Sequence, residues 1–246
     1  MIRYLYDGSF EGLMNVLHET YYGDMPDAVE VQTQMQHSML FENKVIETDF
    51  KIYEKVCSTI ENKLSSHILQ LVYKAYLSGN RALDLSIIKY IRKGFKFGVS
   101  IEHNLSDGDI LIVNKYARRV GFEALRLKGF IRFREVDQIL FSKIQPEYDV
   151  LGLLSDHFVQ RLPYENWIIW DANRSKLLIN QKKGIEIVEV NNVDIENLYE
   201  GKLDDYEKLW KLYFENIGVE GRLNLKTQKS YMPKRYWANL IEMKDK

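Results

Sequence analysis

The spacing of apolar residues indicates helices in the first half of the chain and strands in the second. Between residues 48 and 128, apolar residues recur every three or four positions, which is the period of an amphipathic helix. The period then changes to two, because Ile131 and Phe133 alternate with Arg132 and Arg134, as in a half-buried strand. This order predicts an α+β fold, in which a helical block is followed by a mostly antiparallel sheet with flanking helices.

Capping and turn residues set the limits of the predicted elements. Ser9 is a candidate N-cap of the first helix, and Thr48 or Asp49 of the second. Helices are predicted over 10–22, 50–63, 67–77, 81–96, 107–128, 150–162, 204–216 and 233–243. Strands are predicted over 2–6, 28–33, 131–136, 139–144, 167–171, 176–180 and 185–190. We interpret residues 1–246 as a single domain, with a weak subdivision near 99–106.

The helix predicted over 107–128 has one apolar and one basic face. At 100° per residue, its apolar stripe consists of Ile110, Val113, Ala117, Val120, Ala124 and Leu127. The opposite face gathers Lys115, Arg118, Arg119, Phe122 and Arg126. Glu123 is the acid available to neutralise this face, through an i,i+4 pair with Arg119. The strand that follows is expected to add Arg132 and Arg134 on one side of the sheet.

The net charge of −1 conceals two basic blocks. Residues 115–134 hold seven Lys and Arg against one acid, and residues 222–246 hold seven against two. Local fields of this kind attract anions, and aromatic residues among the cations suit a phosphate backbone that carries stackable bases. The pattern predicts contact with nucleic acid, although an ordinary solvated helix face has the same composition.

The C-terminal block supplies a second candidate contact. Pro233 is expected to begin the last helix, whose first N–H groups face an anion readily. Lys234 and Arg235 in the first turn oppose the helix dipole at about 0.3–1 kcal/mol each, a cost that an anionic ligand would offset. Tyr236 could stack on a base or anchor the helix in the core. Arg222 belongs to the same predicted contact set.

Other residues carry weaker chemical signals. Asp156, His157 and Asp171 could serve acid–base or metal chemistry, but neighbouring helix residues point about 100° apart, so a surface or capping role is the favoured interpretation. The remaining histidines show no spacing typical of metal ligands, so no metal site is predicted. Cys57 is the single cysteine, which excludes an internal disulfide and fits the reducing cytoplasm. The sequence also shows no secretory signal and no membrane span, so we expect a soluble cytoplasmic protein.

Four segments, in the same order, resemble a bacterial family described as probable DNA metabolism or DNA repair proteins. They are YDGSFEGLMNVLHE (6–19), RRVGFEALRLKGFIRFRE (118–135), DHFVQRLPYENWIIWDANR (156–174) and RLNLKTQKSYMPKRYWANLIE (222–242). The resemblance implies a gene beside a radical-SAM protein of DNA modification or repair, and in some bacteria the domain is joined to a uracil-DNA-glycosylase-like domain. The chain lacks that domain and the three-cysteine motif of a radical-SAM enzyme, so no cofactor of its own is expected.

Three hypotheses follow. The first is a DNA-associated accessory protein that binds DNA through the basic helix face and assists a radical-SAM partner. The second is a metal-dependent or acid–base enzyme that acts on DNA or nucleotides. The third is a protein–protein adaptor whose basic face meets an acidic partner surface. The sequence leaves open whether the protein is an enzyme.

Overall fold

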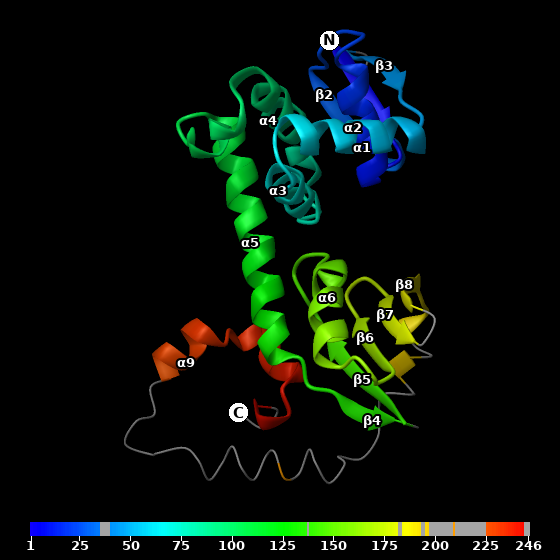
Figure 1. Ribbon diagram of the computed structural model, residues 1–246, viewed down its shortest axis with the longest axis vertical. Coiled ribbons are helices and arrows are strands. Elements are labelled where there is room, and N and C mark those ends of the chain that lie inside the picture. Colours follow the sequence, from blue (N-terminus) through cyan, green and yellow to red (C-terminus); the bar gives the residue numbers. More distant parts are fainter. Residues whose placement is uncertain are drawn as a thin grey trace. The chain divides into compact units, whose positions relative to one another are not determined.

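The computed structural model describes residues 1–34, 40–136, 138–181, 184–192, 195–196, 209 and 225–243. The chain divides into two compact units, Met1–Gly121 and Phe122–Lys246. The division falls inside the long helix α5 (Gly108–Phe130), which Figure 1 draws in green. Residues 99–106, where the sequence indicates a weak subdivision, lie within the first unit.

The first unit contains a three-stranded parallel sheet. Its order is β2-β1-β3, with β1 (Ile2–Tyr6) between β2 (Ala28–Val31) and β3 (Glu42–Val45). Parallel neighbours need a crossover connection, and the helix α1 (Phe10–Glu19) supplies it between β1 and β2. The strand predicted over 28–33 ends at Val31, two residues earlier than expected. Residues 42–45 form a strand that the alternation of apolar and polar residues did not predict.

Helices cover this sheet, and local capping residues set where they begin. Ser9 Oγ accepts from the Gly12 N–H at 2.8 Å at the start of α1, and Asp49 Oδ1 accepts from the Lys51 N–H at 2.7 Å at the start of α2. The further helices of the unit are α2 (Phe50–Lys63), α3 (Ser66–Tyr76) and α4 (Asp84–Phe97), with short 3-10 turns η1 (Gln32–Gln34), η2 (Arg81–Leu83) and η3 (Val99–His103).

The apolar stripe predicted for 107–128 is confirmed. All six of its residues lie on α5 and are at most 5% exposed. Ile110, Val113 and Ala117 join the apolar core of the first unit, together with residues of α1, α2, α3 and α4. The opposite side of α5 is thereby left at the surface.

The second unit contains a five-stranded sheet of order β4-β5-β6-β7-β8. Its strands are β4 (Arg134–Val136), β5 (Ile139–Ile144), β6 (Trp167–Asp171), β7 (Lys176–Gln181) and β8 (Gly184–Glu189). The strands β5 and β6 are parallel because α6 (Leu151–Arg161) connects them, whereas the other neighbours are antiparallel. The α+β class is thus confirmed, and the expectation of a mostly antiparallel sheet is wrong, since the sheet is mixed.

The predicted strand at 131–136 begins three residues later than expected. The Ile131 N–H still donates to the Leu127 carbonyl at 3.0 Å, so the helical hydrogen-bond pattern continues past Phe130. The strand β4 begins at Arg134. Arg132 therefore precedes the sheet and does not share a strand face with Arg134, which corrects the expected arrangement of these two arginines.

The C-terminal segment also differs from the prediction. A helix α9 (Leu225–Tyr231) is followed by two 3-10 turns, η5 (Lys234–Asn239) and η6 (Ile241–Met243), in place of one α-helix over 233–243. Pro233 precedes the first turn. The helix predicted over 204–216 and Arg222 lie outside the described residues, apart from position 209. Among the described residues, no helix is both long and apolar enough to cross a membrane.

Candidate nucleic-acid interface

The basic face of α5 begins in the first unit with three exposed cations. Lys115, Arg118 and Arg119 lie at the surface, on the side away from the buried stripe. The Arg119 guanidinium lies 5.3 Å from the centre of the Tyr116 ring, in a cation–π arrangement. The arginines present planar guanidinium groups, which suit phosphate recognition.

Further along the same helix, the second unit adds exposed apolar groups. Phe122 is 54% exposed and Leu125 is 64% exposed, while Arg126 is half-buried. Exposed Phe and Leu side chains at neighbouring helix positions are typical of surfaces that meet a partner.

Both acids of α5 are engaged elsewhere. Asp109 accepts from Lys93 Nζ at 2.8 Å and from Ser86 Oγ at 2.9 Å, within the first unit. Glu123 is 1% exposed and points into the second unit, where its carboxylate has four partners. The predicted pairing of Glu123 with Arg119 is therefore wrong, because backbone and tyrosine donors inside the second unit take the carboxylate.

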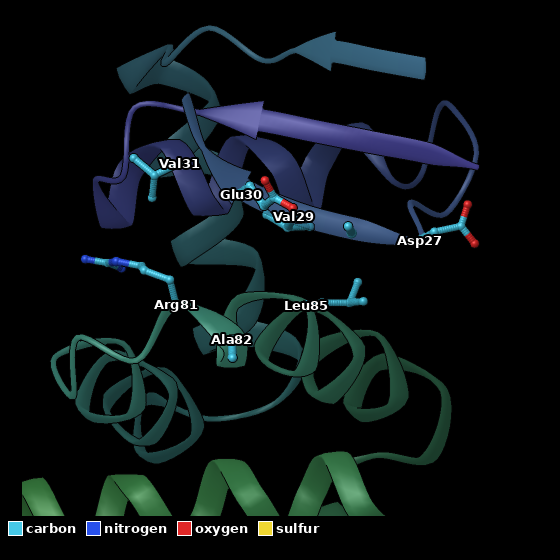
Figure 2. Close-up of a pocket in the computed structure, with 8 residues that line it drawn as sticks. Asp27, Val29, Glu30, Val31, Arg81, Ala82 and Leu85 are labelled. Atoms are coloured by element: carbon cyan, nitrogen blue, oxygen red, sulfur yellow. The ribbon is translucent and has the colours of Figure 1, made fainter. Parts of the chain in front are cut away.

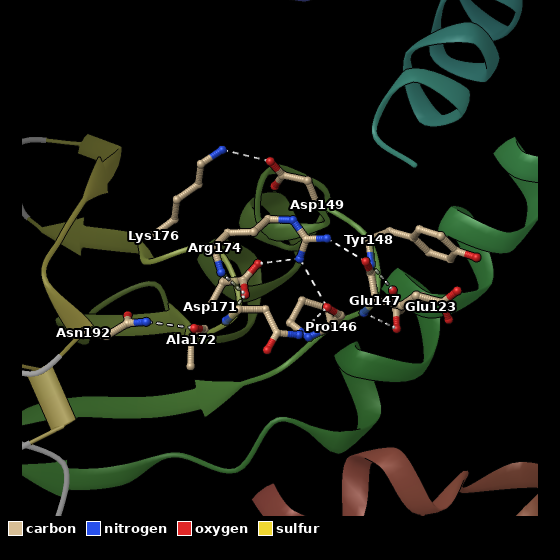
Figure 3. A network of polar contacts seen from close by, with 11 residues as sticks. Glu123, Pro146, Glu147, Tyr148, Asp149, Asp171, Ala172, Arg174, Lys176 and Asn192 are labelled. Carbon is tan, nitrogen blue, oxygen red and sulfur yellow. Dashed lines mark hydrogen bonds and ion pairs between the residues drawn. The ribbon is translucent and has the colours of Figure 1, made fainter. Parts of the chain in front are cut away.

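The Glu123 carboxylate connects three segments of the second unit, and Figure 3 shows its contacts with the segment after β5. Its two oxygens accept from the backbone N–H groups of Glu147 at 3.1 Å and Tyr148 at 2.8 Å, which follow β5. Tyr236 Oη of η5 donates to it at 2.8 Å, and Arg235 Nη2 lies 3.4 Å away. A buried carboxylate needs such donors to offset its lost hydration, so this cluster, which we call the Glu123 network, is structural.

A second polar cluster closes the turn between β6 and β7. Figure 3 shows the Arg174 side chain reaching from this turn to the carbonyls of Pro146 and Glu147, at 3.2 and 2.6 Å. Arg174 Nη1 also lies 3.1 Å from Asp171 Oδ2, and Asp171 Oδ1 accepts from the Asn173 N–H at 3.0 Å. Burial raises the pKa of Asp171, and the Arg174 charge acts in the opposite direction.

The residues considered for acid–base chemistry do not form one site. Asp171 is fully buried and occupied by the β6–β7 turn, whereas Asp156 is exposed on α6. The His157 ring packs on Phe158, and burial, with the charges of Lys128 and Arg161, lowers the pKa of His157. Within the described ranges, no three His, Cys, Asp or Glu side chains are placed to hold a metal ion.

Several of the predicted contact residues are engaged within the protein. Arg132 Nη2 lies 2.8 Å from Glu242 Oε1, and Arg134 is largely buried. Arg235 pairs with Glu147 as well as Glu123. Tyr236 is 3% exposed, so of its two predicted roles the core role is observed, and burial with the Glu123 hydrogen bond raises its pKa to about 12.

Lys234 keeps the exposure that contact with an anion requires. Its Nζ lies 5.6 Å from the centre of the half-buried Trp237 ring. The expected α-helical N-terminus at Pro233 is absent, because the segment that follows it is a 3-10 turn. Lys234 is therefore an exposed lysine directly before the paired Arg235.

A pocket of about 480 Å³ lies in the first unit between β2 and the start of α4 (Figure 2). Arg81 and Val31 lie at one end and Asp27 at the other. Next to it, Tyr6 Oη donates to the buried Asp84 at 2.6 Å, and burial raises the pKa of Asp84 to about 6, against the Tyr6 hydrogen bond and the Arg81 charge. The sequence did not predict this pocket. The signal that could have pointed to it is the acid Asp84 at the start of the apolar face of α4.

The comparisons with known proteins identify a family but assign no activity to it. Residues 81–242, about two thirds of the chain, match the family described as a domain of unknown function, DUF4130. The matched segment contains α4, α5 and the whole five-stranded sheet. No curated protein matches the chain. Because the match covers well over half of the sequence, the chain belongs to the DUF4130 family of domains of unknown function.

Proposed function

We propose that the protein is a nucleic-acid-associated accessory protein in DNA repair or modification, and that it binds DNA through the basic face of α5. One observation carries the proposal. Both acids of this helix, Asp109 and Glu123, are held by other partners, whereas Lys115, Arg118 and Arg119 are exposed. The field of these cations is therefore not cancelled by acids of their own helix, and an exposed cluster of this kind attracts a polyanion.

The proposed contact contains fewer residues than the two basic blocks of the sequence. Its centre is Lys115, Arg118 and Arg119, and Phe122 and Arg126 follow along the same helix. Arg132 and Arg235 are paired with acids and Arg134 is buried, so we do not include these three arginines in the direct phosphate contacts. Lys234 is the exposed cation among the residues predicted for the C-terminal contact that the structure describes without an ion pair.

The partner follows from the resemblance and from the cysteine count. A radical-SAM cluster needs three cysteines, and this chain has one, Cys57, whose pKa is raised by burial. We propose that radical chemistry is supplied by a partner protein and that both act in the reducing cytoplasm. The enzyme hypothesis gains no support from the placement of Asp156, His157 and Asp171.

A protein–protein adaptor is the second candidate, and the exposed apolar side chains of α5 favour it. Phe122 and Leu125 stand beside the cations, and mixed apolar and cationic surfaces also suit an acidic protein partner. In that case the protein would copurify with its partner and show no DNA affinity at low salt.

Binding to a short fluorescein-labelled duplex, followed by anisotropy over a salt series, tests the proposal. Affinity should fall with salt at a log–log slope of about −0.9 per phosphate contact. Arg118→Glu with Arg119→Glu should abolish binding. Arg161→Glu with Lys96→Glu makes the same charge change on two exposed helical residues outside both basic blocks and serves as the matched control. Full binding by the α5 variant would refute the assigned interface.

A further inference from the structure

A second pocket in the first unit, of about 450 Å³, combines aromatic rings with lysines. It is lined by residues at the end of α1, on one face of α2 and near the end of α4. Leu17 and Val56 contribute buried apolar surface. Among the described residues that line it, none carries a carboxylate. The pocket beside β2 differs, because there Asp27 and Glu30 face a single Arg81.

The aromatic residues of this α1–α2 pocket are held by their neighbours yet remain accessible. The His18 and Tyr22 rings lie 4.7 Å apart, and Tyr22 is 74% exposed. Tyr21 meets the edge of Phe95 at 6.3 Å, and the Arg92 guanidinium lies 4.5 Å from its ring centre. Exposed aromatic rings beside cations are the groups on which nucleic-acid bases stack.

The lysines of the pocket stand on one stripe of α2. Lys55, Thr59 and Lys63 are spaced by four residues, so they share a helix face. Eight residues of helix place the two lysine positions about 12 Å apart along the axis. Among the residues that the structure describes, neither lysine has an ion-pair partner. The pocket thus presents two unneutralised positive charges next to stacking surfaces.

We propose that the α1–α2 pocket binds an unpaired nucleotide, with the base against Tyr22 and a phosphate at Lys55 or Lys63. A planar aromatic group that carries an anion fits both halves of the lining, and a nucleotide has this composition. A base inside a duplex is already stacked and paired, so the pocket selects single-stranded nucleic acid or a free nucleotide. The ligand class is shared with the proposed function, but the residues are different ones, on α1 and α2.

The test compares two labelled single strands of equal length, one with bases and one fully abasic, by fluorescence anisotropy. The intact strand should bind more tightly than the abasic strand. Tyr22→Ala should weaken binding of the intact strand by about 5- to 150-fold and leave the abasic strand unchanged. Tyr22→Phe should retain the difference, because the ring remains. Tyr164→Ala, at an exposed tyrosine of the second unit outside both basic blocks, is the control.

The lysines are tested by salt dependence. Lys55→Ala and Lys63→Ala should each reduce the log–log salt slope for the single strand by about 0.7 per lost phosphate contact. Arg161→Ala removes an exposed cation of the second unit outside both basic blocks and should leave the slope unchanged. Equal slopes for the pocket variants and for this control would overturn the assignment of the phosphate to these lysines.

The remaining arms separate the ligand sources and the two proposals. Displacement of the strand by thymidine monophosphate would identify a free nucleotide as sufficient, whereas binding of the strand alone would identify single-stranded nucleic acid. Equal affinity of the wild type for intact and abasic strands, or an unchanged affinity in Tyr22→Ala, overturns the pocket. The two proposals can also fail separately. If Arg118→Glu with Arg119→Glu still binds the duplex, while Tyr22→Ala abolishes the difference in affinity between intact and abasic strands, the pocket is supported and the α5 interface is refuted.

Discussion

Removal of the Glu123 carboxylate is the perturbation whose consequence the structure defines best. Glu123→Ala would leave the N–H groups of Glu147 and Tyr148 and the hydroxyl of Tyr236 without their acceptor. These donors belong to the loop after β5 and to η5, so both segments would lose hydrogen bonds to α5, while the packing of the Tyr236 ring on Phe130 would remain.

The magnitude follows from the burial of these donors. A buried donor that loses its acceptor costs about 1–3 kcal/mol, less where water can enter the space. Three such donors are left by this substitution, and their costs add where the space stays closed to water. We therefore expect Glu123→Ala to lower the free energy of unfolding of the second unit by about 3–5 kcal/mol. Arg235 is 42% exposed, so its charge is screened, and Arg235→Ala should cost under about 1 kcal/mol.

Urea unfolding followed by tryptophan fluorescence is the assay, since all four tryptophans lie in the second unit. Glu123→Gln keeps one acceptor oxygen and should lose an intermediate amount. Tyr236→Phe should cost about 1 kcal/mol and should be non-additive with Glu123→Ala, because both remove the same hydrogen bond. A loss below about 1 kcal/mol for Glu123→Ala, or equal losses for Glu123→Ala and Arg235→Ala, would refute the reasoning.

Three further outcomes are expected. Gly12→Ala would place a Cβ 2.3 Å from Asp7 Oδ1, so it should destabilise the first unit by about 1–3 kcal/mol in thermal unfolding followed by circular dichroism. The pKa of Asp84 is about 6 in the folded state against 3.8 for the ordinary residue, so its contribution to stability is complete below pH 4 and is lost as pH rises through 6. In Asp84→Asn the melting temperature should therefore depend less on pH between pH 4 and 6 than in the wild type. If the variant's plot of melting temperature against pH ran parallel to that of the wild type, Asp84 would not be the titrating group. Arg132→Ala leaves the carboxylate of Glu242 buried without this partner and should cost about 3–5 kcal/mol, whereas a double substitution with Glu242→Gln should recover part of the loss.

Features that depend on residues near one another in the chain could be predicted from the sequence. The buried stripe of α5 follows from a 3.6-residue period, and the cap at Ser9 follows from one side chain and an N–H three residues on. The α+β class follows from the change of period near residue 130. These signals are local, so no knowledge of the remaining chain was needed.

Features that depend on distant partners could not be predicted. The direction of the Glu123 side chain depends on Tyr236, 113 residues away, and on backbone N–H groups after β5. Alternation placed Arg132 in a strand, but the hydrogen bond from Ile131 to Leu127 prolongs the helix. The strand β3 pairs in parallel with β1, although the sequence between β2 and β3 carries no helical signal that would predict a crossover. The α1–α2 pocket likewise unites residues 17–22 with residues 55–63 and Phe95.

The basic face of α5 and the stability of the second unit depend on the same helix but on different residues. Arg118 and Arg119 are exposed, so reversal of their charge should change ligand affinity and leave the unfolding transitions in place. Glu123 is buried, so its substitution should lower stability, while the molecules that remain folded keep their affinity for DNA. If both substitutions altered both properties together, the cations would be required for folding, and their exposure would no longer argue for a ligand. Separate effects would show that α5 joins a structural role on one face to a binding role on the other.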